Sequence, residues 1–341
     1  MIDSLKIKNF TVFKNAEFEF SPGLNVIIGE NGSGKSHLLK LIYTMSRVLH
    51  DEQDSLSKGF DFPNLSFTLS DRLFKTFLPD KIESLIRRGN GKIAEISARL
   101  GKRILNYHLG SDKQHCDGTM AHETPKYPIF IPPKEVLAIY YGFTALYEKR
   151  EVSFDMTFND LCNSVGLPVL REKHLTEVKA LFSELEKAIG GQIIIENGRV
   201  YLKPFDKPKM EINLVAEGWR KIGLFALLIR NGSIQPGYTL LWDEPEANLN
   251  PQLEQLVAKT LVGMVKRKAH VFLVSHSLFL LKEIELLLEK EPFPIKFFNL
   301  RLKNGCTSFE EGSRLSELKN ILSLDEALKQ DDREQDAFWK K

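Results

Sequence analysis

Apolar runs of four to eight residues, separated by polar turns, recur along the N-terminal part of the chain. Such runs predict β-strands when turn residues bound them, and Ser21-Pro22-Gly23 is a turn between two of them. The longer run at 37–49 is instead predicted to be a helix. The predicted strands of this part lie at 5–8, 15–20, 24–28, 93–99 and 103–109.

Helical patterns dominate the middle of the chain. Residues 135–165 and 171–190 are predicted helices, and the second places Leu175, Val178 and Leu181 on one apolar face. Twenty residues of this pattern make one packed helix, whereas a coiled-coil arm needs many sustained heptads. A hairpin follows, with strands at 192–196 and 199–203 around an Asn-Gly turn.

Buried strands alternate with helices in the C-terminal half. The strands at 238–242 and 271–274 flank a helix at 250–268, which predicts two parallel strands whose ends share one edge of a sheet. The tail from 315 to 341 is charged and helix-prone. Further predicted elements are strands at 210–214 and 295–300 and helices at 222–230 and 278–288.

The most specific motif lies between the strand at 24–28 and the helix at 37–49. Residues 29–36 match G-x-x-x-x-G-K-[ST], in which backbone N–H groups surround phosphate oxygens, Lys35 reaches the β- and γ-phosphates and Ser36 ligates Mg²⁺. We therefore predict binding of a nucleoside triphosphate, taken as ATP, with Mg²⁺. The predicted nucleotide-binding residues are Gly29, Glu30, Asn31, Gly32, Ser33, Gly34, Lys35, Ser36 and His37.

Two acidic residues end the strand at 238–242. Asp243 is predicted to hold Mg²⁺ together with Ser36, and Glu244 to polarise a water as the catalytic base, with Glu246 as the next candidate. His276 follows the strand at 271–274 and is the second predicted catalytic residue. It can hydrogen-bond the γ-phosphate or the attacking water, because both strands end on the same edge.

Together these motifs resemble the ABC-type ATPases. Residues 215–221 are similar to the signature segment of the SMC, RecF-like and OLD-type branch, although Ala216 stands where that family has a serine. The resemblance also identifies residues 246–251 as the D-loop, which bridges two subunits. It implies contact with the γ-phosphate side of a second subunit by Ala216, Glu217, Gly218 and Asn248. With no hydroxyl at Ala216, the anion would meet only backbone N–H groups and the helix dipole.

The resemblance also implies the architecture. We expect an α/β P-loop NTPase fold with the mixed sheet of an ABC-type head, no long coiled coil, and an antiparallel β-subdomain formed by the first three predicted strands. Residues 1–50 and 210–310 would form the ATPase core, 51–209 an α/β insertion lobe and 311–341 a charged helical tail. A closer resemblance is to the short RecF-like ATPases of Septu-type and retron-associated anti-phage modules. It rests on the segments 130–137 and 217–221.

Composition agrees with a cytoplasmic protein. The 341 residues are 43% apolar and 27% charged, and the net charge of +2 does not itself indicate nucleic-acid or membrane binding. The three cysteines have no paired spacing, which is typical of a reducing compartment. The N-terminus lacks the pattern of a signal peptide, and no apolar run approaches the ~18 residues of a membrane span.

Weaker features leave alternatives open. His108, His115, Cys116 and His122 could hold zinc, but their spacing matches no recognised ligand pattern and a solvated loop is favoured. Short basic clusters, such as that at 266–268, could contact DNA or RNA but are more often solvated faces. No glutamine of a family Q-loop is identifiable. Phe10 and Phe13 could equally stack an adenine or pack between lobes.

We therefore predict an ATPase, slow or stimulated by a partner, that forms an ATP-bound dimer and controls a separate effector, such as a nuclease or toxin, in anti-phage defence or a DNA transaction. The alternatives are a RecF-like DNA-repair ATPase and the nucleotide-binding subunit of a membrane transporter. The Glu217-Gly218 signature and the long insertion disfavour the transporter. An OLD-type nuclease is disfavoured because 65 residues follow His276.

Overall fold

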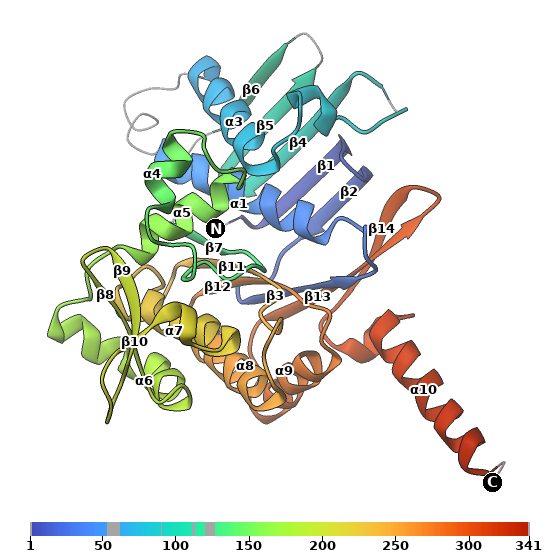
Figure 1. The fold of residues 1–341 in the computed structure, drawn as a ribbon. Helices are drawn as coiled ribbons and strands as arrows, with labels where there is room; N and C mark the ends of the chain where they lie inside the picture. Colours follow the sequence, from blue (N-terminus) through green and yellow to red (C-terminus); the bar gives the residue numbers. More distant parts are fainter. Residues whose placement is uncertain (1, 53–61, 90, 111–112, 120–126, 340–341) are drawn as a thin grey trace.

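The computed structural model describes residues 2–52, 62–89, 91–110, 113–119 and 127–339. A mixed six-stranded sheet forms the centre of the molecule, beneath a second, antiparallel sheet (Figure 1). Its strands are β3 (Leu24–Gly29), β7 (Pro128–Ile131), β11 (Thr239–Asp243), β12 (His270–Val274), β13 (Ile295–Lys303) and β14 (Cys306–Gly312). Their order is β14-β13-β3-β12-β11-β7, with only β14 antiparallel to its neighbour.

The central strands are apolar on both faces because both faces are covered. Alternate residues of β3 enter different cores: Val26 packs with the helices of one face, and Ile27 with the helix and second sheet of the other. On the first face lie α7 (Glu217–Arg230), α8 (Pro251–Lys266) and α9 (Leu278–Lys290), and on the second α1 (Lys35–Asp51). The predicted P-loop NTPase fold with an ABC-type mixed sheet is confirmed.

The antiparallel sheet differs from the predicted three-stranded subdomain. Its order is β2-β1-β4-β5-β6, so β3 is not part of it and residues from the predicted insertion complete it. The face that carries Leu105 and Tyr107 is buried, whereas polar side chains line the other. The strands are β1 (Ser4–Phe10), β2 (Phe13–Glu19), β4 (Ile93–Leu100), β5 (Arg103–Gly110) and β6 (Gln114–Thr119).

The boundary of the predicted insertion lobe is therefore wrong in two places. Besides β4–β6, strand β7 belongs to the central sheet, where it pairs in parallel with β11 through Ile129 and Leu240. All four residues of β7 are buried, and a fully apolar strand is stable only where both of its faces are covered. Residues of the predicted insertion therefore contribute strands to both sheets.

The helical middle is more broken than predicted. The expected helix at 135–165 is replaced by α4 (Phe143–Glu148) and α5 (Met156–Val165), and Gly142 and Arg150, which flank α4, adopt left-handed conformations with φ 74° and 59°. The helix at 171–190 and the hairpin are confirmed. They are α6 (Glu172–Ala188), β8 (Gly191–Glu196) and β9 (Arg199–Pro204), to which β10 (Met210–Glu211) pairs before the 3₁₀ turn Ile212–Leu214.

Buried polar pairs tie α1 to the inserted helices. Tyr43 donates a hydrogen bond of 2.6 Å to Asp160 of α5, and Arg72 of α3 (Phe62–Phe77) forms an ion pair with the same carboxylate. Lys40 of α1 lies 2.8 Å from Asp155, the N-cap of α5. The helix that follows the phosphate-loop motif is thus coupled directly to α3 and α5.

The C-terminal tail forms α10 (Leu322–Trp339), which projects away from the body (Figure 1). Short 3₁₀ turns lie at Ile82–Leu85 and Leu315–Glu317. The sequence did not predict β14, which follows β13 through a tight turn at Asn304-Gly305. Within the described ranges, no helix combines the length and apolar character needed to cross a membrane.

His270 is an uncharged histidine in the core, and it predicts a pH dependence of stability. Its Nε2 lies 3.0 Å from Asn25 Nδ2, which donates to it, and burial lowers the pKa of His270 to about 3. The unfolded chain takes up this proton near pH 6.5, so the stabilisation is complete above that pH and is lost as pH falls toward 3. At pH 5 the loss due to His270 should be about 2 kcal/mol relative to pH 7.

Urea unfolding of the wild type and of His270→Gln at pH 7 and pH 5 measures the contribution of His270 to the free energy of unfolding. Glutamine keeps an acceptor for Asn25 but does not titrate. The contributions of all other titrating groups therefore cancel when the two proteins are compared. The wild type should lose about 2 kcal/mol more than the variant between the two pH values. Equal losses in both proteins would show that His270 does not carry the effect.

Candidate active site

The phosphate-loop motif lies between the end of β3 and the start of α1. Gly29 and Gly34 have φ values of 139° and 95°. A Cβ at Gly29 would lie 2.0 Å from the carbonyl oxygen of Leu300, and one at Gly34 would lie 2.5 Å from Val12. Both positions therefore require glycine, because the backbone conformation and the close approach exclude a side chain. Gly32, φ 78°, faces open space.

The ammonium group of Lys35 closes the loop. Its Nζ donates to the carbonyl oxygens of Gly29 at 2.9 Å and Glu30 at 2.7 Å. Burial lowers the pKa of Lys35, while the negative charges of Asp243 and Glu244 oppose that shift. The loop is also fixed from β14, because the Thr307 hydroxyl donates to the Ser33 carbonyl at 2.8 Å. The Lys35 ammonium group and the Thr307 hydroxyl thus hold the loop through its backbone carbonyl groups.

Asp243 ends β11 beside the loop, and only 3% of its surface is exposed. Burial raises the pKa of Asp243 to about 6, and a hydrogen bond from the Ser36 hydroxyl partly offsets the shift. Its Oδ1 has no hydrogen-bond partner among the described residues. Mg²⁺ prefers oxygen ligands. Here a buried carboxylate oxygen without a hydrogen-bond partner and a serine hydroxyl lie next to each other. The two residues therefore fit the predicted metal site.

Glu244 and His276 meet at the adjacent strand ends. Glu244 adopts φ 51°, and its N–H donates to the Val274 carbonyl at 2.9 Å, which links the ends of β11 and β12. Its Oε1 lies 3.9 Å from His276 Nε2, and both side chains are about 40% exposed. Burial, followed by the charge of Lys35, lowers the pKa of His276, which favours the neutral imidazole. The structure thus brings the predicted base and histidine together.

Glu246 has a different position from Glu244. Its Oε1 accepts hydrogen bonds from the N–H groups of His276 at 2.6 Å and Ser277 at 3.1 Å, and from the Ser275 hydroxyl at 3.0 Å. These contacts, all to Oε1, fix the turn that carries His276, while Oε2 is buried and has no hydrogen-bond partner among the described residues. Glu246 is therefore a positioning residue, a role that the sequence did not indicate.

The signature segment begins α7 as expected. Ala216 is its N-cap and makes no side-chain cap hydrogen bond, and the exposed Glu217 stands in the first turn. A Cβ at Gly218 would lie 2.5 Å from the carbonyl oxygen of Asn248 in the same chain. Gly218 thus packs against the D-loop of its own subunit, whereas Ala216, Glu217 and Asn248 are exposed.

Two further residues connect α7 to the site. Lys221 is buried and donates to the carbonyl oxygens of Glu244 at 2.9 Å and Ala247 at 3.0 Å, so it holds the acidic turn. Arg220 forms a 3.2 Å ion pair with Glu135, which follows β7. Glu135 lies in the loop after the edge strand β7, and the sequence motifs did not single it out. The charged pair Lys134-Glu135, which follows the apolar run at 128–131 and two prolines, was the available signal.

A cavity of about 410 Å³ lies beside the loop. His37 of α1 and Phe77 of α3 line it with Thr11, Val12 and Arg88, and the two rings contact edge to face at 5.6 Å. His37 therefore faces the cavity next to the phosphate loop. Phe10 and Phe13 are fully buried in the core, so lobe packing, rather than adenine stacking, is their role.

Comparisons with known proteins find matching ATPase-domain families and similar folds. A family profile described as "AAA ATPase domain" matches residues 1–135, and one described as "AAA domain, putative AbiEii toxin, Type IV TA system" matches 166–282. The "SmcHead" bound to a ScpA domain superposes with a TM-score of 0.56 at 16% identity, covering 92% of this chain and 98% of that one. The SMC head domain from Thermotoga maritima gives 0.50 at 13% identity, covering 91% and 98%.

Sequence relatives match over shorter spans. RecF of Oenococcus oeni is 27% identical over 116 residues, which are 33% of this chain and 27% of RecF. RecN of Rickettsia typhi is 34% identical over 84 residues, which are 24% and 15% of the two proteins. The chain thus matches less than a third of the length of either relative. Its fold is that of an SMC head domain, and its sequence matches AAA ATPase domain profiles and segments of RecF and RecN.

Proposed function

We propose that this SMC/RecF-like chain binds ATP with Mg²⁺ and hydrolyses it to ADP and phosphate. The observation that carries the proposal is the buried Asp243 Oδ1, open to a ligand beside Ser36 and within the electrostatic reach of Lys35. Mg²⁺ would be held by Asp243 and Ser36 and would neutralise charge on the phosphates. Lys35 would exchange its carbonyl partners for the β- and γ-phosphate oxygens.

Glu244 and His276 supply the remaining chemistry. Glu244 carries a partly exposed carboxylate that can accept a proton from water, and the neutral imidazole of His276 can donate to the γ-phosphate. Glu246 and Lys221 hold the backbone on either side of this pair. The cavity lined by His37 and Phe77 is the proposed site of the nucleoside, because it adjoins the loop and has an aromatic wall.

We further propose that ATP assembles a head-to-tail dimer, with the loop of one subunit facing the α7 N-terminus of the other. Leu214 and Trp219, which flank that N-terminus, are 74% and 44% exposed. Exposed apolar side chains around a helix N-terminus fit a surface that a partner covers while the helix dipole meets a phosphate. Ala216, Glu217 and Asn248 would contribute through their backbone.

Two substitutions at Ala216 test the dimer. Aspartate and serine both cap α7 and should stabilise the fold by about 0.5–2 kcal/mol, but only aspartate places a negative charge against the partner's γ-phosphate. In a Glu244→Gln background, light scattering with ATP and Mg²⁺ should show a dimer for Ala216→Ser and a monomer for Ala216→Asp. A mass that is unaffected by ATP in the Glu244→Gln protein would contradict the dimer.

The cellular role we propose is control of a separate effector in a bacterial anti-phage or DNA-transaction complex, in the cytoplasm. Support comes from the toxin-system family matched at 166–282 and from the ties between α1 and the inserted helices, through which nucleotide state can reach a partner. The RecF and RecN likeness favours a DNA-repair ATPase as the second candidate, with DNA or RNA as the partner.

Steady-state ATPase assays separate the two roles. Turnover should rise with the purified product of an adjacent reading frame if the chain controls an effector. Turnover that rises only with duplex DNA would support the repair role and contradict effector control. Lys35→Ala protein serves as the background control for contaminating ATPase.

A further inference from the structure

Two histidines and an aspartate form a cluster on the polar face of the antiparallel sheet, away from the nucleotide site. His108 of β5 is the direct cross-strand partner of His115 of β6, and Asn106 is the partner of Asp117. Alternate residues of a strand share a face, so all four side chains stand together. The interpretation of this segment as a solvated loop is therefore wrong for its described residues. His122 lies outside the described residues.

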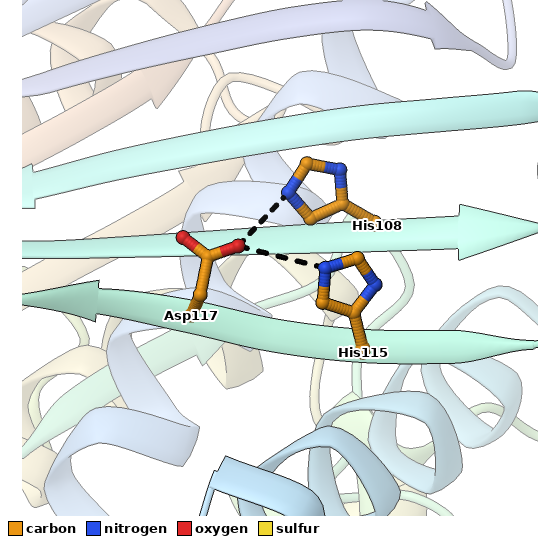
Figure 2. A group of neighbouring side chains, drawn as sticks. All are labelled: His108, His115 and Asp117. Atoms are coloured by element: carbon orange, nitrogen blue, oxygen red, sulfur yellow. Dashed lines mark ion pairs between the residues drawn. The ribbon is translucent and has the colours of Figure 1, made fainter.

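Asp117 faces both imidazole rings, and one of its oxygens is paired with each of them (Figure 2). Asp117 Oδ2 lies 3.2 Å from His108 Nε2 and 3.6 Å from His115 Nε2, and the candidate ligand atoms are all within 4.8 Å of one another. The imidazole rings stack at 4.4 Å with planes 6° apart. Ligands bound at ~2.1 Å to a zinc ion in tetrahedral geometry lie roughly 3.4 Å from each other. The distances from Asp117 Oδ2 to the two Nε2 atoms match this separation between neighbouring ligands.

A fourth residue holds the aspartate. Asn106 Nδ2 donates to Asp117 Oδ1 at 2.7 Å, which leaves Oδ2 directed at the imidazoles. Hydrogen bonding of the non-ligating oxygen is the usual second shell of a carboxylate ligand. On the opposite face of the strands, Tyr107 and Cys116 are buried beneath α3. The cluster is thus presented by a rigid, packed sheet, and Cys116 points away from it.

We propose that His108 Nε2, His115 Nε2 and Asp117 Oδ2 bind one divalent transition-metal ion, with Zn²⁺ the best fit. Imidazole ligands select Zn²⁺ and its neighbours over Mg²⁺ and Ca²⁺, which prefer oxygen. The side chains are 31%, 54% and 52% exposed, so an ion can reach them. Three protein ligands leave the fourth position of a zinc ion for water or for a donor from another molecule.

Zinc binding to the tag-free full chain, after chelator treatment and without nucleotide, tests the site. Calorimetric titration with ZnCl₂ should give one more bound ion per chain in the wild type than in Asp117→Asn, which keeps the side-chain shape. His174→Ala removes an exposed histidine that lies 3.6 Å from Glu177 on α6, and it should retain the wild-type stoichiometry. Asn106→Leu should bind the ion about 10- to 100-fold more weakly.

A second readout guards against misfolding. Co²⁺ bound to the wild type should give visible absorption bands that Zn²⁺ displaces, and these should be absent in Asp117→Asn and in His115→Asn with unchanged circular dichroism. Equal Zn²⁺ stoichiometry in the wild type and Asp117→Asn would overturn the proposal and leave a metal-free histidine–aspartate ion pair. Because no nucleotide is present, this outcome is independent of ATP hydrolysis.

Discussion

Replacing Glu244 with glutamine should reduce ATP turnover about 10²-fold or more, the range for loss of a general base, while ATP and Mg²⁺ still bind. Glutamine keeps the shape of the side chain, whose Oε1 lies 3.9 Å from His276 Nε2, but it cannot accept the proton of water. Asp243, Ser36 and Lys35 remain in place, so affinity should change little. Single-turnover hydrolysis and calorimetric ATP titration measure the two quantities separately.

Glu289→Gln on the exposed face of α9 is the matched control, and it should hydrolyse ATP at the wild-type rate. Glu246→Gln makes a second comparison, because Glu246 accepts three hydrogen bonds that position His276. It should lower turnover while its pH profile stays that of the wild type. If Glu244→Gln retains the wild-type rate, Glu244 is not the base.

Lys35→Ala should weaken ATP binding about 30-fold or more, since removing one partner of a buried charged hydrogen bond costs about 2–5 kcal/mol. The Lys35 ammonium is buried at the mouth of the loop with two carbonyl partners that it can exchange for phosphate oxygens. No neighbouring backbone group can supply its positive charge. Calorimetric titration with ATP and Mg²⁺ measures the loss directly.

Lys187→Ala, on the exposed end of α6, controls for the removal of one positive charge and should bind ATP normally. The unfolding midpoint of Lys35→Ala should stay close to that of the wild type in the absence of ATP. Unchanged ATP affinity in a folded Lys35→Ala protein would exclude the loop as the nucleotide site.

The local motifs could be predicted because their function depends on residues that are adjacent in the chain. Gly29 and Gly34 are required by backbone conformations that only glycine adopts freely, and Lys35 and Ser36 follow at fixed offsets at the start of a helix. Asp243 and His276 were predictable for a related reason. A helix between two parallel strands places both strand ends on one edge, so sequence order alone brought them to the site.

Strand partners that are distant in sequence could not be predicted in this way. An apolar strand such as β7 fits any buried sheet, and the choice of β11 as its neighbour depends on the shape of the assembled core. The same holds for β4, which pairs with β1 across more than 80 residues. The sequence pattern therefore predicts both strands to lie in a separate lobe, whereas β7 completes the central sheet and β4 lies within the antiparallel sheet.

The sequence by itself determined the fold class and the residues around the proposed phosphate and magnesium sites, because short-range backbone and side-chain chemistry encodes them. Only the tertiary structure decided the role of Glu246, the packing of Gly218 against Asn248 and the convergence of His108, His115 and Asp117. Each of these depends on a backbone turn or strand register, and a register shift of one residue would turn His108 to the buried face. Cross-strand register arises from the packing of the whole sheet, which no local spacing in the chain records.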